Sequence, residues 1–82
     1  MLLHLGANIS ILKKDVIAIF DYEATKNGST KDFVQAHKKA GQIMEIGGAD
    51  KSKSVVVARD RIYFSPISPV TLQRRSEGLH II

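Results

Sequence analysis

Short apolar segments separated by polar turns recur along the first part of the chain, and this pattern predicts strands. Residues 2–5 and 9–12 flank Gly6-Ala7-Asn8, where Gly6 and Asn8 can take the positive φ of a tight turn. We predict an opening β-hairpin here. Residues 16–20 are almost continuously apolar, which is typical of a strand buried on both faces. We therefore place this strand at the centre of the sheet.

One stretch predicts an amphipathic helix of about residues 30–40. It follows a turn signal at Asn27-Gly28, and Ser29-Thr30 provides an N-cap with an acid in the first turn. Gly41 stands where a left-handed C-cap is expected. One face of the helix should cover the sheet. Its apolar stripe comprises Phe33, Ala36, His37 and Ala40, with Val34 beside it.

The second half of the chain predicts three further strands and a short helix. A strand at 42–46 leads through Gly47-Gly48 to a hairpin, whose Val-rich and aromatic strands, 54–58 and 62–65, are joined by residues 59–61. Ser68-Pro69 is an N-cap and first residue for a short helix at 70–75. We predict one α+β domain over 1–82, with a small, mainly antiparallel sheet, one central helix, a short C-terminal helix and an ambiguous tail at 76–82.

The chain of 82 residues has a net charge of +4, and its basic residues are unevenly distributed. Residues 1–50 hold six lysines and six acids, whereas residues 51–75 hold six cations and only one acid, Asp60. Such asymmetry suits a polyanionic partner, either nucleic acid or an anionic membrane surface. The alternative is a solvated basic face that aids solubility.

Lys51 and Lys53 are the main candidates for contact with such a partner. They alternate with Ser52 and Ser54, so an extended chain places both lysines on one face and both hydroxyls on the other. Lysines on one face suit phosphate contact without sequence readout. Alternatively, the pair guards a loop beside an edge strand. The full candidate DNA-binding set is Lys51, Lys53, Lys13, Lys14, Arg59 and Arg61.

Motifs for catalysis, metals or cofactors are missing from the sequence. The three histidines are widely separated, there is no cysteine, and neither a nucleophile elbow nor a phosphate loop occurs. We predict a non-enzyme with no cofactor and no metal. Tyr22 and Tyr63 could stack on bases, and a small RNA-binding oligomer is therefore a further hypothesis.

The size of the chain bears on its assembly and location. A chain this short builds a thin core, and without disulfides it often gains stability by packing against copies of itself. We therefore expect a homo-oligomer. The N-terminus lacks the pattern of a secretory signal, and the longest apolar run is far short of the ~20 residues of a membrane helix. We expect a soluble, cytoplasmic protein with no membrane partner.

Four segments resemble one known family. They are residues 1–6 (MLLHLG), 15–21 (DVIAIFD), 53–57 (KSVVV) and 62–75 (IYFSPISPVTLQRR). Together they resemble the RemA/RemB family of bacterial extracellular matrix regulators, and the RemB branch more than the RemA branch.

This resemblance implies a LytTR-like fold, a closed ring of identical subunits, and binding to promoter DNA that activates matrix and biofilm genes. Lys51 and Lys53 match the place of DNA-contacting arginines in the RemA branch, so the charge is kept while the bidentate guanidinium is lost. Another basic RemA position falls near Lys14 or Asp15. The alternative is an oligomeric scaffold, or a protein partner of a DNA-binding paralogue, without useful DNA affinity.

Overall fold

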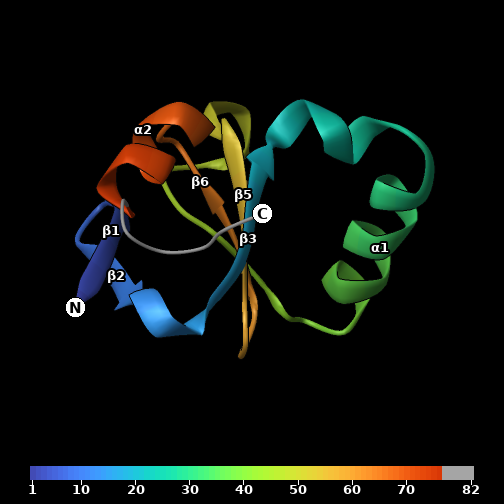
Figure 1. Ribbon diagram of the computed structural model, residues 1–82. Coiled ribbons are helices and arrows are strands. Elements are labelled where there is room, and N and C mark those ends of the chain that lie inside the picture. Colours follow the sequence, from blue (N-terminus) through green and yellow to red (C-terminus); the bar gives the residue numbers. More distant parts are fainter. Residues whose placement is uncertain (77–82) are drawn as a thin grey trace.

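The computed structural model describes residues 1–76 of the chain as a small α+β fold (Figure 1). The predicted class is therefore confirmed, while the predicted tail lies, from residue 77 onward, outside the described residues. The elements are β1 (Leu2–Gly6), β2 (Ile9–Leu12), the 3-10 helix η1 (Lys13–Asp15), β3 (Val16–Asp21), the 3-10 helix η2 (Tyr22–Lys26), α1 (Gly28–Lys39), β4 (Ile43–Glu45), the 3-10 helix η3 (Ala49–Lys51), β5 (Ser54–Ala58), β6 (Ile62–Ser65) and α2 (Pro69–Arg75).

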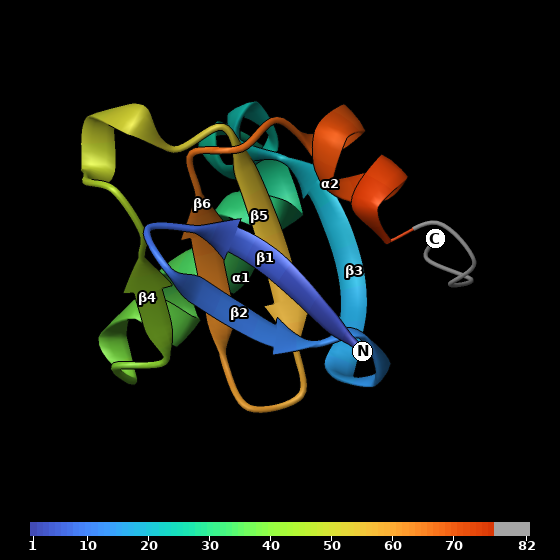
Figure 2. The same ribbon diagram turned by 90° about the vertical axis from the view of Figure 1, so that its left-hand side faces the viewer.

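The strands form two sheets. The larger has the order β3-β5-β6-β4, in which β4 runs parallel to β6 and the other neighbours are antiparallel. The smaller is the β1-β2 hairpin, which lies across one face of the larger sheet together with α2, while α1 lies on the other face (Figures 1 and 2). The strands are thus mainly antiparallel, as predicted, but they do not form a single sheet.

The prediction that residues 16–20 form the central strand is wrong. β3 lies at the edge of the four-stranded sheet, because the β5-β6 hairpin occupies the centre and β4 adds to the far side of β6. Residues 16–20 of β3 are all apolar because the two faces of the strand contribute to two different cores: Ile19 to one and Phe20 to the other. Ile17, at an irregularity in the pairing with β5, is 55% exposed.

The opening hairpin is confirmed, and its turn is tighter than predicted. Gly6, Ala7 and Asn8 all have positive φ, at 110°, 47° and 65°, so Ala7 adopts a conformation that costs a non-glycine residue energy. A Cβ atom at Gly6 would lie 3.2 Å from Cγ of Pro66. Glycine is therefore required at this position by both the backbone angle and the close approach of the loop after β6.

The hydrophobic core is divided by the sheet into two clusters. The larger lies under the β1-β2 hairpin and α2, and the smaller lies under α1. Tyr63 belongs to the first and Phe64 to the second, so these neighbours point to opposite faces of the sheet. The buried members of the larger cluster are Leu3, Leu5, Ile19, Ile46, Val56, Ala58, Tyr63 and Leu72; those of the smaller are Val34, Val55, Ile62 and Phe64.

The predicted buried stripe of the central helix is wrong. Within α1 only Val34 is buried, and it packs with Val55, Ile62 and Phe64. Phe33 is 40% exposed and its ring lies on that of His37, with 4.4 Å between the ring centroids. The apolar face of the sheet is wider than this single helix residue, since Phe20, Ile43 and Val57 also pack against the cluster and are only partly buried. The helix therefore covers the sheet thinly.

The ends of α1 follow the prediction only in part. Asn27 is the N-cap residue, and its side chain makes no capping hydrogen bond, so the cap predicted at Ser29-Thr30 is wrong. Gly41, after the last turn, has a φ of 71°, as expected of a left-handed terminator. The C-terminal end of α1 therefore has a glycine terminator, whereas its N-terminal end lacks a side-chain cap.

The short helix α2 begins as predicted. The Ser68 hydroxyl accepts a hydrogen bond from the Thr71 amide at 3.3 Å, and Pro69 occupies the first helical position. We expect Ser68→Ala to lower the free energy of unfolding by about 1 kcal/mol, because the amide loses its capping acceptor. Urea denaturation of both proteins at equal concentration measures this change. An Asp at position 68, which also caps, should restore most of the loss, and no recovery with Asp would contradict the capping role.

Buried serines tie the loop after β6 to the rest of the molecule. The Ser65 hydroxyl donates to the Leu5 carbonyl at 2.7 Å and accepts from the Ile67 amide at 3.1 Å. The Ser54 hydroxyl donates to the Ile67 carbonyl at 2.6 Å. Both serines are fully buried, so these bonds are shielded from water. The serine at position 65 thus connects the first strand with the last one.

Candidate nucleic-acid interface

The six candidate DNA-binding residues lie in two groups at opposite ends of the four-stranded sheet. The turn end is defined here by the start of β3, the β5-β6 turn and the start of β4; the loop end is the opposite one, where β5 starts. The structure does not bring the six residues together. The turn end holds Lys13, Lys14, Arg59 and Arg61, and the loop end holds Lys51 and Lys53.

At the turn end, backbone pairing joins η1 to the hairpin turn. The Arg59 amide donates to the Asp15 carbonyl at 3.0 Å, and the Arg59 Nε atom lies 3.9 Å from Asp15 Oδ1. Arg61 Nε lies 3.6 Å from Asp60 Oδ2. Both ion pairs are exposed to solvent, so they hold the arginines only weakly. The guanidinium groups therefore stay available to an external anion.

Tyr63 supports the acidic residue in the middle of this turn. Its hydroxyl donates to Asp60 Oδ2 at 3.4 Å. Burial, with the negative charge of Asp60 as a further cause, raises the pKa of Tyr63 above its usual value of 10. The phenol therefore remains a neutral donor at physiological pH. Since Tyr63 is buried in the core, its ring face is not offered to a base, and Tyr22 packs edge-on against Phe64 with 5.1 Å between centroids.

At the loop end, Lys51 and Lys53 do not lie in one extended segment. Lys51 ends η3, and only Lys53 continues directly into β5. The serine hydroxyls are turned inward: Ser54 is bonded to Ile67, while the buried hydroxyl of Ser52 has no hydrogen-bond partner among the described residues. The predicted extended conformation is therefore wrong at Lys51, whereas the predicted alternation of exposed lysines with inward hydroxyls is observed.

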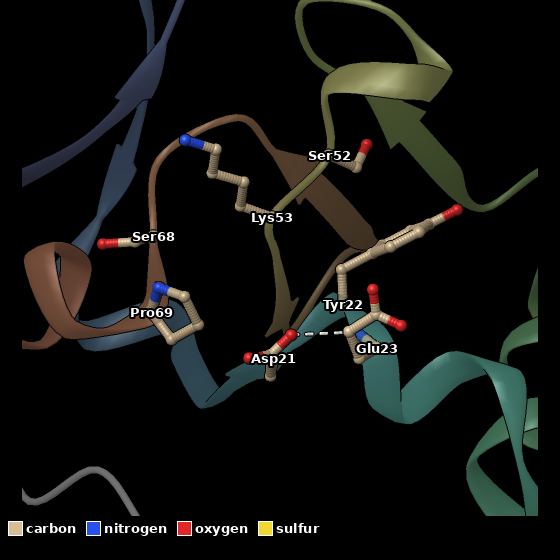
Figure 3. Close-up of a pocket in the computed structure, with 7 residues that line it drawn as sticks. All are labelled: Asp21, Tyr22, Glu23, Ser52, Lys53, Ser68 and Pro69. Atoms are coloured by element: carbon tan, nitrogen blue, oxygen red, sulfur yellow. Dashed lines mark hydrogen bonds between the residues drawn. The ribbon is translucent and has the colours of Figure 1, made fainter.

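Lys53 also lines a shallow pocket of about 260 Å³ (Figure 3). Asp21 and Glu23 lie on another wall, where the Asp21 carboxylate accepts from the Glu23 amide at 2.9 Å. The Lys53 ammonium group points away from the Asp21 carboxylate (Figure 3). Over the loop end as a whole, cations and carboxylates are equal in number. The loop end holds Lys26, Lys51 and Lys53 against Asp21, Glu23 and Asp50.

Two further lysines, which the sequence analysis did not include, lie at the turn end. Lys38 and Lys39 form the last turn of α1, and the chain passes from there directly into β4. In Figures 1 and 2, η1, the β5-β6 turn and the last turn of α1 all lie along the lower edge of the molecule. The sequence does contain a local signal for this basic helix end, because two adjacent lysines stand just before a helix terminator and a strand.

The fold and the placement of these residues can now be compared with known proteins. The family model described as RemA-like, Extracellular matrix regulatory protein A-like, matches residues 2–75. This chain belongs to the RemA-like family. The matched region of the RemA-like chain includes both basic groups and all the helices and strands that the structure describes within residues 1–76.

A curated relative agrees with this assignment. The RemA-like chain is similar to Extracellular matrix regulatory protein B of Bacillus subtilis (strain 168), with 31% identity over 77 residues. The alignment covers 94% of this chain and 91% of the relative. The resemblance seen in the sequence motifs is therefore confirmed across nearly the whole chain. Within residues 1–76, no helix is long and apolar enough to cross a bilayer.

Proposed function

We propose that this RemA-like protein is a cytoplasmic transcriptional regulator of extracellular matrix and biofilm genes that binds duplex DNA as a ring-shaped homo-oligomer. Membership of a family of extracellular matrix regulatory proteins is the observation that carries the regulatory role. Exposed cations on opposite ends of one small sheet support binding to a polyanion. The resemblance to the RemA/RemB family and its LytTR-like fold supports DNA as that polyanion.

Self-association is supported by the exposed apolar side chains. Ile17, Phe33 and Val70 are each at least 40% exposed, and so are three residues at the free end of the opening hairpin. Small domains with thin cores commonly cover such surfaces by packing against copies of themselves. Repetition of a weak basic site around a closed oligomer multiplies its affinity for one duplex. The three hairpin residues are Met1, Leu2 and Leu12.

The alternative function is an oligomeric scaffold, or a partner of a DNA-binding paralogue, without DNA affinity of its own. The balanced charge at the loop end favours this alternative, because Lys51 and Lys53 stand among as many acids as bases. If the arginines of the RemA branch act at these positions, their replacement by lysine here removes bidentate phosphate contact.

Equilibrium binding to a fluorescent duplex across a salt series tests the proposal. We expect the affinity of the natural protein to fall linearly with salt on logarithmic axes, because each phosphate contact releases counterions. The Lys51→Glu/Lys53→Glu variant should bind at least about tenfold more weakly if the loop contacts DNA. The oligomer mass of both proteins, measured by light scattering, controls for loss of assembly.

Each outcome of this experiment has a distinct meaning. Absence of binding by the natural protein at about 0.1 M salt would contradict DNA binding and favour the scaffold. Binding that the loop variant retains in full would keep DNA binding but remove Lys51 and Lys53 from the contact surface. A purely monomeric protein at micromolar concentration would contradict the ring.

A further inference from the structure

The topology of the sheet gathers three basic groups at the turn end. Lys13 and Lys14 lie just before β3, Arg59 and Arg61 lie between β5 and β6, and Lys38 and Lys39 lie before β4. Because β3, β6 and β4 start at the same end at which β5 stops, the strand order β3-β5-β6-β4 arranges these groups as a row. Figures 1 and 2 show the same order along the lower edge.

The last turn of α1 is fixed to this row by backbone hydrogen bonds. The Gln42 amide donates to the His37 carbonyl at 3.0 Å, and the Gln42 carbonyl accepts from the Ile62 amide at 2.9 Å. Through these two hydrogen bonds, Gln42 links the last turn of α1 directly to Ile62, the first residue of β6. The Gly41 amide donates to the Lys38 carbonyl at 3.1 Å. Lys38 and Lys39 are both exposed, so their side chains are presented to solvent at this end.

The turn end carries a strong excess of positive charge. Six cations stand against two carboxylates, Asp15 and Asp60, which gives a net charge of +4. Each carboxylate lies within 4 Å of an arginine of the turn. Among residues 1–76, none of the four lysines of the row forms an ion pair. Two further exposed cations, Arg74 and Arg75, lie in the last turn of α2. Compared with the balanced loop end and with this pair, the turn end holds the largest group of cations among residues 1–76.

We propose that this row, including Lys38 and Lys39, is the main surface that contacts DNA phosphates. This inference rests on the DNA binding proposed above. Three strand spacings make the row about 14 Å wide, which is close to the width of the major groove of B-DNA, about 12 Å. The lysines before β3 then contact one backbone and those of α1 contact the other. The arginine turn, which protrudes between them, faces the groove.

An anionic membrane fits this surface less well than DNA does. Membrane surfaces are bound by cations together with apolar side chains that enter the headgroup region. Near this surface, large exposed apolar residues lie beside η1, at Met1, Leu2, Leu12 and Ile17. Within residues 1–76, the β5-β6 turn and the last turn of α1 carry none, and Phe33 lies one turn earlier in the helix. The part of the row that is free of apolar residues matches the uniform charge of a phosphate backbone.

The Lys38→Gln/Lys39→Gln variant tests the proposal, because glutamine keeps helix propensity and removes charge. We expect its affinity for a fluorescent duplex to be at least about tenfold lower in about 0.1 M salt. Its loss of affinity between about 50 and 200 mM salt should be about tenfold smaller than that of the natural protein, since two phosphate contacts per site are removed. The matched control is Lys26→Gln/Lys31→Gln, which removes two exposed lysines outside the row and should bind within about threefold of the natural protein.

The results separate this inference from the proposed function. If the natural protein does not bind DNA, both fail. If it binds DNA and the Lys38→Gln/Lys39→Gln variant binds equally well with an unchanged salt dependence, only the row is overturned. An equal loss in the control would also overturn the row, because it would show a general effect of net charge. Stronger binding of the natural protein to vesicles with anionic lipid than to DNA would assign this surface to a membrane instead. Circular dichroism and oligomer mass establish that each variant is folded.

Discussion

Replacement of Leu72 by alanine is expected to lower the free energy of unfolding by about 3 kcal/mol. Leu72 is 0% exposed and is the buried hydrophobic residue with which α2 enters the larger core, beside Leu3, Leu5 and Ile19. Truncation of a buried leucine costs about 2–5 kcal/mol, because contacts are lost and a cavity remains. A helix of seven residues has too little intrinsic stability to stay formed without this anchor.

This loss is large for a domain of 82 residues, whose total stability is expected to be about 4–12 kcal/mol. Urea denaturation at one fixed protein concentration measures it, since assembly makes stability depend on concentration. The matched control is Gln73→Ala on the same helix, where the side chain is exposed and belongs to neither core. We expect the control to change stability by less than about 0.5 kcal/mol. Equal losses in the two variants would contradict the anchoring role of Leu72.

The second large effect is expected for Ser65→Ala, at about 2–4 kcal/mol. The substitution removes the donor to the Leu5 carbonyl and the acceptor for the Ile67 amide. The Ser65 side chain is fully buried, and each buried group left without a partner costs about 1–3 kcal/mol. The first loss falls on the contact between β1 and β6 and the second on the loop after β6, so the opening hairpin and this loop should loosen first.

Ser54→Ala provides the comparison for this prediction. Ser54 is equally buried but makes one side-chain hydrogen bond, to the Ile67 carbonyl. We expect it to cost less than Ser65→Ala in the same denaturation experiment. Amide hydrogen exchange should show faster opening of β1 in the Ser65 variant. A smaller loss at Ser65 than at Ser54 would show that the tie between the first and last strands contributes little.

Local features of the fold were predictable from the sequence. The tight turn at Gly6, the hairpin around residues 59–61 and the Ser68-Pro69 helix start depend on the conformational preferences of a few adjacent residues, and all three are confirmed. The order of strands was not predictable in the same way. An apolar run predicts burial on two faces, but an edge strand between two cores satisfies that pattern as well as a central strand does.

The candidate site shows the same division. The charged residues could be identified from the sequence, but the grouping depended on which strands are neighbours. A count along the chain assigned Lys38 and Lys39 to a neutral half, because Asp21, Glu23 and other acids precede or follow them. Folding separates these lysines from Asp21 and Glu23, which lie at the loop end, and places them near Arg61. The distribution of charge in the folded protein therefore differs from its distribution along the sequence.

The hydrogen bond between Ser65 and Leu5 spans 60 residues, and this separation affects how the chain folds during its synthesis on the ribosome. At about 5–20 residues per second, the first strand waits about 3–12 s before its partner is translated. β3 also waits for β5, so the earliest lasting structure among the strands is the opening hairpin alone. The nascent chain thus keeps the apolar residues of β1 and β3 exposed until β5 and β6 have been translated. Its exposure to chaperones ends only when the last strand and α2 emerge.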